Sequence, residues 1–117
     1  MRSGRASAVS RLTQRITELT PCVSKRLIRL ALQRLVNERG ADTIAAFVCE
    51  PVMGTGGVYP PSLGYLTAVQ GICRENEILF VVDEVITGFG RTGAMFASER
   101  FGLTPDMLIL AKGITSG

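Results

Sequence analysis

Three ionisable residues, Glu50, Asp83 and Lys112, each follow directly after an apolar run of the chain. A lysine that is partly removed from water loses basicity and becomes a nucleophilic amine, which can form an imine with an aldehyde. A carboxylate beside it can hold a proton on a ring nitrogen or pair with a cation. Because the sequence contains no histidine, proton transfer here must use Lys, Asp, Glu, Tyr or Cys.

The segments that precede these three residues predict the elements that position them. Near-continuous apolar runs are typical of strands buried on both faces, and they cover Thr43–Cys49, Ile78–Val82 and Met107–Ala111. Helical spacing of apolar residues predicts helices over Leu27–Arg39 and Ser62–Asn76. This alternation of strands and helices predicts an α/β fold with three parallel strands and covering helices.

Each predicted helix has one apolar face. The faces consist of Ile28, Ala31, Leu32 and Leu35 in the first helix, and of Leu63, Leu66, Val69 and Cys73 in the second. Gly40 is a natural end for the first helix. Glycine and proline predict loops over Val52–Pro61 and Thr87–Gly93, followed by a short helix over Met95–Phe101. We expect Gly88, Gly90 and Gly93 to shape the backbone, and Glu84, Cys49 and Cys73 to be buried.

The carboxyl ends of parallel strands are where open α/β sheets bind ligands, so we expect Glu50, Asp83 and Lys112 to face one crevice. Charges beside a dry core need one another or a charged ligand, and the pattern alone leaves both a salt-bridge network and a binding site open. An imine-forming lysine and a carboxylate that keeps a pyridine nitrogen protonated are the two groups that pyridoxal phosphate chemistry most requires.

Three segments carry a more specific signal. They are EPVMGTGGVYPP at Glu50–Pro61, DEVITGFGRTG at Asp83–Gly93 and PDMLILAKGITSG at Pro105–Gly117. In this order and with similar spacing, they resemble the class III pyridoxal-phosphate-dependent aminotransferases, in particular the omega-aminotransferases. The resemblance covers roughly Leu30–Gly117 and implies part of the large domain of a fold type I enzyme, which is a homodimer.

The resemblance also implies roles for single residues. Lys112 would form the Schiff base with pyridoxal 5'-phosphate, and Asp83 would pair with the pyridine nitrogen. Val85 would lie against the cofactor ring. Many relatives carry glutamine after this valine, whereas the sequence has Ile86, as does the subset acting on omega-amines and omega-amino acids. Glu50 matches a glutamate that in some relatives pairs with a substrate-gating arginine, which lies beyond this sequence.

The implied reaction moves an amino group from an amine or omega-amino acid to a 2-oxo acid. An aminomutase of the same family and an inert gene fragment remain alternatives. We expect the chain alone to be inactive. The resemblance implies a phosphate-binding glycine/serine turn, a stacking aromatic residue and a substrate-binding small domain, none of which is visible in it.

The basic residues are concentrated in the N-terminal part of the chain. Residues 1–40 hold nine lysines and arginines against two acidic residues, whereas residues 41–117 hold four against eight. We divide the chain into a basic leader, 1–26, which we expect to be disordered, and a partial cofactor-binding domain, 27–117. The leader lacks interleaved aromatic residues, so a nucleic-acid-binding module is a weaker alternative. We expect a cytoplasmic protein, with the mitochondrial matrix as the alternative because the leader is rich in arginine and serine.

Other classes of site fit poorly. No histidine and no CxxC pair is present, so we expect no metal site. The run ILFVVDE is typical of a nucleotide-binding strand, but the glycine-rich phosphate loop that should accompany it is absent. The uncharged stretch Pro51–Cys73 is interrupted by glycines and prolines, and we expect no membrane-spanning helix there.

Overall fold

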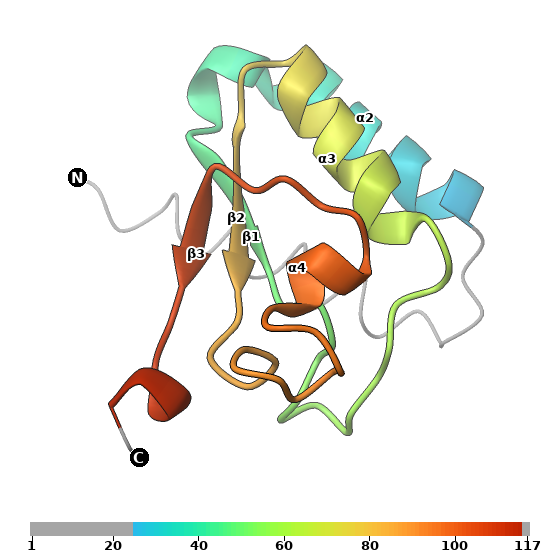
Figure 1. Ribbon diagram of the computed structural model, residues 1–117. Coiled ribbons are helices and arrows are strands. Elements are labelled where there is room, and N and C mark those ends of the chain that lie inside the picture. Colours follow the sequence, from blue (N-terminus) through green and yellow to red (C-terminus); the bar gives the residue numbers. More distant parts are fainter. Residues whose placement is uncertain (1–24, 116–117) are drawn as a thin grey trace.

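A three-stranded parallel sheet organises the fold in the computed structural model, which describes residues 25–115 (Figure 1). The strands are β1 (Ala46–Cys49), β2 (Leu79–Asp83) and β3 (Met107–Ile109), in the spatial order β1-β2-β3. The helices are α2 (Lys25–Arg39), α3 (Tyr65–Glu75) and α4 (Ala97–Arg100), with 3₁₀ turns η1 (Ala41–Thr43) and η2 (Lys112–Ile114). The predicted α/β fold and the parallel direction of its strands are confirmed.

The hydrophobic core lies between one face of the sheet and the helices α2 and α3 (Figure 1). The register pairs Phe47 with Phe80, and their rings stack with centroids 6.4 Å apart. The core also takes Leu32 and Val36 from α2, Cys49 and Val82 from the strands, and Leu66, Val69, Ile72 and Cys73 from α3. The predicted helix faces are therefore confirmed in their central residues. Leu63 is an exception at 87% exposed, because α3 begins only at Tyr65. The side chain of Ile28 lies outside the described part.

The opposite face of the sheet is open. Alternation along the paired strands puts one set of apolar side chains there, and Val48, Leu79, Met107 and Ile109 are exposed. All three residues of β3 are exposed, so the prediction that every strand is buried on both faces is wrong for this structure. The physical reason is that α2 and α3 both cover the same face. Within residues 25–115, no helix covers the other.

The element boundaries differ modestly from those predicted. Gly40 ends α2 as expected, with a φ of 80° and its N–H donating to the carbonyl of Val36 at 2.9 Å. The chain then makes the turn η1, so β1 starts at Ala46 and not at Thr43. β3 ends at Ile109, and the following turn begins at Lys112.

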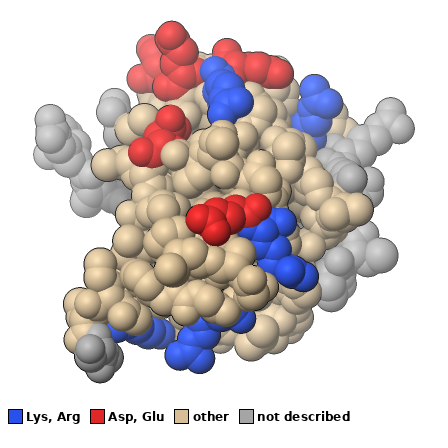
Figure 2. All heavy atoms as spheres, viewed as in Figure 1, with Lys and Arg blue, Asp and Glu red and all other residues tan. Residues whose placement is uncertain are grey.

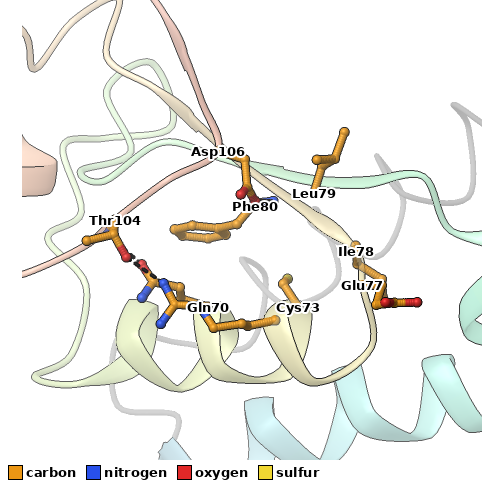
Figure 3. Close-up of a pocket in the computed structure, with 9 residues that line it drawn as sticks. Gln70, Cys73, Glu77, Ile78, Leu79, Phe80, Thr104 and Asp106 are labelled. Atoms are coloured by element: carbon orange, nitrogen blue, oxygen red, sulfur yellow. Dashed lines mark hydrogen bonds between the residues drawn. The ribbon is translucent and has the colours of Figure 1, made fainter.

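A pocket of about 220 Å³ lies at the amino ends of β2 and β3 (Figure 3). The backbone N–H of Phe80 donates to Asp106 Oδ2 at 2.8 Å, and the N–H of Asp106 returns a bond to the Phe80 carbonyl at 2.9 Å. Beside them, Arg74 donates to the Thr104 hydroxyl, and Gln70 accepts from the Thr104 N–H. These polar groups already bond to one another. Their hydrogen bonds stabilise the fold at the end of the sheet opposite the predicted site.

The two ends of the sheet also differ in charge. On the face shown in Figure 2, acidic side chains gather at the upper end, whereas the lower end carries basic side chains only. The lower end is where the strands finish in Figure 1. Most of the predicted leader, 1–26, lies outside the described residues. In the part that is described, no helix is long and apolar enough to cross a membrane.

Candidate functional site

The carboxyl ends of the three strands bring the predicted site residues to one end of the sheet (Figure 1). Glu50 follows the last residue of β1, and Asp83 is the last residue of β2. Asp83 pairs in register with Ile109, the last residue of β3, and Lys112 follows shortly after in η2. The three predicted residues therefore lie at the same end of the sheet.

Glu50 and Ile86 meet at a glycine in the loop after β1. The Glu50 carboxylate accepts the backbone N–H of Gly54, with Oε2 2.6 Å from the nitrogen. The side chain of Ile86 lies against the same glycine, where a Cβ atom would overlap it. The loops that follow β1 and β2 are thus packed together, and the Glu50 carboxylate stabilises its own loop.

Asp83 is half-buried and held by its own turn. Its Oδ1 accepts the backbone N–H of Val85 at 3.0 Å. The N–H of Glu84, which follows Asp83 directly, donates to the carbonyl of Ile109 at 3.0 Å and so joins this turn to β3. Oδ2 of Asp83 accepts no hydrogen bond from residues 25–115, which leaves it free for a donor that arrives with a ligand.

Lys112 has an unusual backbone conformation, with a φ of 51° in the left-handed region. Non-glycine residues are found there at a cost of about 1–3 kcal/mol, and such residues concentrate at functional sites. Its side chain is exposed, so the expectation of a partly desolvated lysine is wrong for this structure, in which the described elements leave this end of the sheet open. Among the described residues, no ion pair joins Lys112 to Glu50 or Asp83. The salt-bridge alternative is thus not realised here.

Glu84 is fully buried, as predicted, and its partners are hydrogen-bond donors. Its Oε2 accepts the Thr87 hydroxyl at 2.5 Å and the N–H of Ala97 at 3.0 Å. Its Oε1 accepts the N–H of Ser98 at 2.7 Å. The carboxylate thus binds the first N–H groups of α4 to the turn that carries Asp83.

The glycines of the loop after β2 shape the backbone as expected. Gly90 and Gly93 have φ values of 89° and 87°, which side chains rarely adopt. At Gly88, a Cβ would lie 2.8 Å from the carbonyl oxygen of Glu84, too close for any side chain. A side chain at any of these three positions would therefore strain the path of the loop.

A model of the family described as aminotransferase class-III matches residues 6–117. The chain belongs to the class III aminotransferases. The match extends into the segment predicted as a leader, and the boundary at residue 26 stays a prediction. Enzymes of this family depend on pyridoxal phosphate and have the fold type I architecture, as the resemblance implied.

Individual relatives agree with the family assignment. The chain is 53% identical over 85 residues to an omega-aminotransferase of Caulobacter vibrioides, covering 73% of this chain and 19% of the relative. It is 50% identical to gamma aminobutyrate transaminase 3, chloroplastic, of Solanum lycopersicum, covering 74% of this chain and 16% of the relative. The solved structure of an (S)-enantioselective omega-transaminase from Thermomicrobium roseum superimposes with a TM-score of 0.79 at 45% identity, over 85% of this chain and 22% of that one. The chain therefore spans less than a quarter of these class III proteins.

Sequence reasoning did not single out Phe89, whose ring lies against Gly113. A Cβ placed on Gly113 would be 2.6 Å from Cδ2 of Phe89. The same ring makes an edge contact with Phe96, with centroids 5.6 Å apart and planes at 67°. The sequence did offer one signal, because Phe89 is a large aromatic residue between two glycines. A loop needed only for its backbone shape would not require such a side chain.

The buried thiols behave as structural residues. Cys49 and Cys73 are free and buried, as predicted. Burial above all raises the pKa of Cys49 from its ordinary value of 9.0 to about 12, and that of Cys73 to about 11. Neither supplies a thiolate near neutral pH, so the candidate chemistry rests on Lys112 and Asp83.

Proposed function

We propose that this chain is the cofactor-binding part of an aminotransferase that moves an amino group from an amine or omega-amino acid to a 2-oxo acid. The observation that supports this most directly is the placing of Asp83 and Lys112 at the carboxyl ends of the adjacent parallel strands β2 and β3. In open α/β sheets, this edge is where ligands bind.

The residues present fit pyridoxal phosphate. Asp83 has one carboxylate oxygen fixed by the Val85 N–H, and no donor among residues 25–115 bonds to the other, as a carboxylate aimed at a protonated pyridine nitrogen requires. Lys112 offers an exposed amine from a constrained backbone. On the face that Figure 2 shows, the side chains of this end are basic and would suit an anionic ligand.

When bound, pyridoxal phosphate supplies an aldehyde for imine formation and a protonated ring that withdraws electrons from the substrate carbon. Lys112 is the residue that we assign to holding it covalently through Nζ. With the substrate amine in its place, the same Nζ would take a proton from the substrate carbon and deliver it to the former aldehyde carbon. Asp83 would pair with the pyridine nitrogen and so favour a positive charge on it.

We further propose that Val85 contacts the cofactor ring and that Ile86 makes the site apolar where many relatives carry glutamine. For Glu50 we propose the substrate-gating role implied by the resemblance. Its carboxylate would have to leave the Gly54 N–H in order to pair with an arginine. Replacing Glu50 by Gln should then alter the preference between charged and uncharged amino acceptors in the complete enzyme. An unchanged preference would remove the role.

The covalent assignment is tested by mixing the purified chain with pyridoxal phosphate, reducing with borohydride and mapping the modified lysine by mass spectrometry. Lys25 and Lys112 are the only lysines of the sequence, so each serves as the control for the other. We expect modification concentrated at Lys112 and reduced in Asp83→Asn. Equal modification of both lysines would mean that this chain holds no specific cofactor site.

Two alternatives concern the complete protein. An aminomutase would use the same Lys112 and Asp83 and would return an isomer of its substrate without a 2-oxo acid. Supplying a 2-oxo acid and measuring the new amino acid by chromatography distinguishes the two reactions. An inert fragment would give neither product, and it would also fail the lysine-mapping test.

The proposed partners are an amino donor, a 2-oxo acid and, in the complete protein, a second copy that forms a homodimer. We propose a cytoplasmic location, with the mitochondrial matrix as the alternative suggested by the arginine- and serine-rich front segment. Fusing residues 1–26 to a fluorescent protein distinguishes the two, because only a targeting segment would direct it to mitochondria.

A further inference from the structure

The turn that carries Lys112 is contacted from the side by a residue of the loop after β2. The Phe89 ring occupies the space where a side chain at Gly113 would begin, since a Cβ there would lie 2.6, 2.8 and 3.0 Å from Cδ2, Cγ and Cβ of Phe89. Gly113 itself does not have a positive φ, whereas Lys112 and Phe89 do, at 51° and 61°. Gly113 is therefore needed for room and not for its backbone freedom.

The Phe89 ring is itself braced from behind. Its edge contacts Phe96, the residue immediately before α4. The first N–H groups of α4 are in turn bound by the buried carboxylate of Glu84. The loop between the two rings is closed by the N–H of Gly90, which donates to the carbonyl of Met95 at 3.2 Å. A continuous series of contacts thus runs from the residue next to Asp83 to the residue next to Lys112.

We propose that Phe89 is a positioning residue that holds the left-handed turn at Lys112 by packing against Gly113, and so aims the lysine amine at the cofactor site. This inference rests on the proposed function of Lys112. Phe89 acts through Gly113 and does not take part in the chemistry. A left-handed lysine is intrinsically disfavoured, so a turn without this support should relax toward ordinary backbone conformations.

The first measurement needs no cofactor. A residue with positive φ brings its own amide and α protons close together, so Lys112 should show a strong intraresidue nuclear Overhauser effect in the isotopically labelled chain. The α protons of Gly113, lying against the ring, should be shifted by its ring current. We expect both signals in the unmodified chain and in Phe89→Tyr, which keeps the ring, and we expect both to be lost in Phe89→Leu.

The second measurement reads out the function. In the borohydride experiment, the ratio of modified Lys112 to modified Lys25 should fall roughly tenfold in Phe89→Leu. This is the factor by which the left-handed conformation of Lys112 should become less populated when its support is removed. Phe89→Tyr should keep the ratio. Phe101→Leu is the matched control, because Phe101 packs against the core away from this turn and its loss lowers stability generally. The ratio should be unchanged in that variant.

A second pair of variants tests the contact from its other side. Gly113→Ala places a methyl group inside the Phe89 ring and should lower the ratio as Phe89→Leu does. In Phe89→Ala combined with Gly113→Ala, the effect should be no larger than in Phe89→Ala alone, because both changes remove the same contact. Additive effects would overturn the proposal.

The outcomes separate this inference from the proposed function. If Phe89→Leu leaves the Lys112 Overhauser effect unchanged, Phe89 does not position the turn, whatever the cofactor does. If the unmodified chain shows both proton signals but labels Lys25 and Lys112 equally, the turn is held as inferred and the cofactor assignment fails.

Discussion

Replacement of Glu84 by Gln should destabilise the chain strongly, although it changes a single atom. The buried carboxylate accepts three bonds, two on Oε2 from Thr87 and Ala97 and one on Oε1 from Ser98. A glutamine can satisfy the first two with its oxygen, but its amide group then faces the Ser98 N–H, donor to donor. Losing one charge-assisted bond and burying an unpaired N–H should together cost about 3 kcal/mol.

That loss is large beside the total stability of a domain, roughly 5–15 kcal/mol. The assay is urea unfolding of the full chain followed by circular dichroism. Glu99→Gln is the matched control, because Glu99 lies in the same helix α4 but is exposed, and its change should stay within about 0.5 kcal/mol. If Glu84→Gln costs no more than this control, the three bonds do not anchor the loop, and the bracing of α4 must come from elsewhere.

Three further predictions concern other parts of the fold. Asp106→Asn should cost about 1–3 kcal/mol in urea unfolding, because the Phe80 N–H loses its carboxylate acceptor, and an unchanged midpoint would contradict this. Since burial raises the pKa of Cys49 and Cys73 from 9.0 to about 12 and 11, the stability they contribute should be complete below about pH 9 and decline as pH rises toward these values. In a chain whose third cysteine is serine, unfolding free energies measured from pH 7 to 11 should fall only above pH 9. A slope that begins below pH 8 would have another origin. Finally, Ile109→Lys should reduce self-association in sedimentation experiments by placing a charge on the open sheet face. Unchanged association would mean that this face does not mediate it.

The sequence predicted the parts of the fold that depend on local pattern. Strand positions followed from apolar runs, and the end of α2 followed from Gly40, because these signals lie within a few residues of their effect. The exposure of β3 was not predictable in this way. Its apolar residues are suited to burial, but whether an element covers them depends on segments far away along the chain.

The candidate site divides along the same line. Asp83 and Lys112 were proposed as site residues because each follows an apolar run, and parallel strands finish at one edge. The partners of Glu84 were not identifiable, since Ala97 and Ser98 come from the next helix. The contact between Phe89 and Gly113 joins two motifs that sequence reasoning treated separately. It depends on a left-handed backbone conformation at Lys112, which the conformational preferences of lysine do not predict.

The order of the three described strands in space is the same as their order along the chain, and this bears on how the chain folds. Ala46 pairs with Leu79, and Val81 pairs with Met107, so each strand finds its neighbour in the segment just synthesised. Loop closure over such modest separations is comparatively cheap in entropy. During translation at roughly 5–20 residues per second, β1 and β2 can pair once β2 has followed α3 out of the ribosome, and β3 is then added beside β2. The turn that carries Lys112 follows β3 in the chain, so it forms at the end of strands that are already paired.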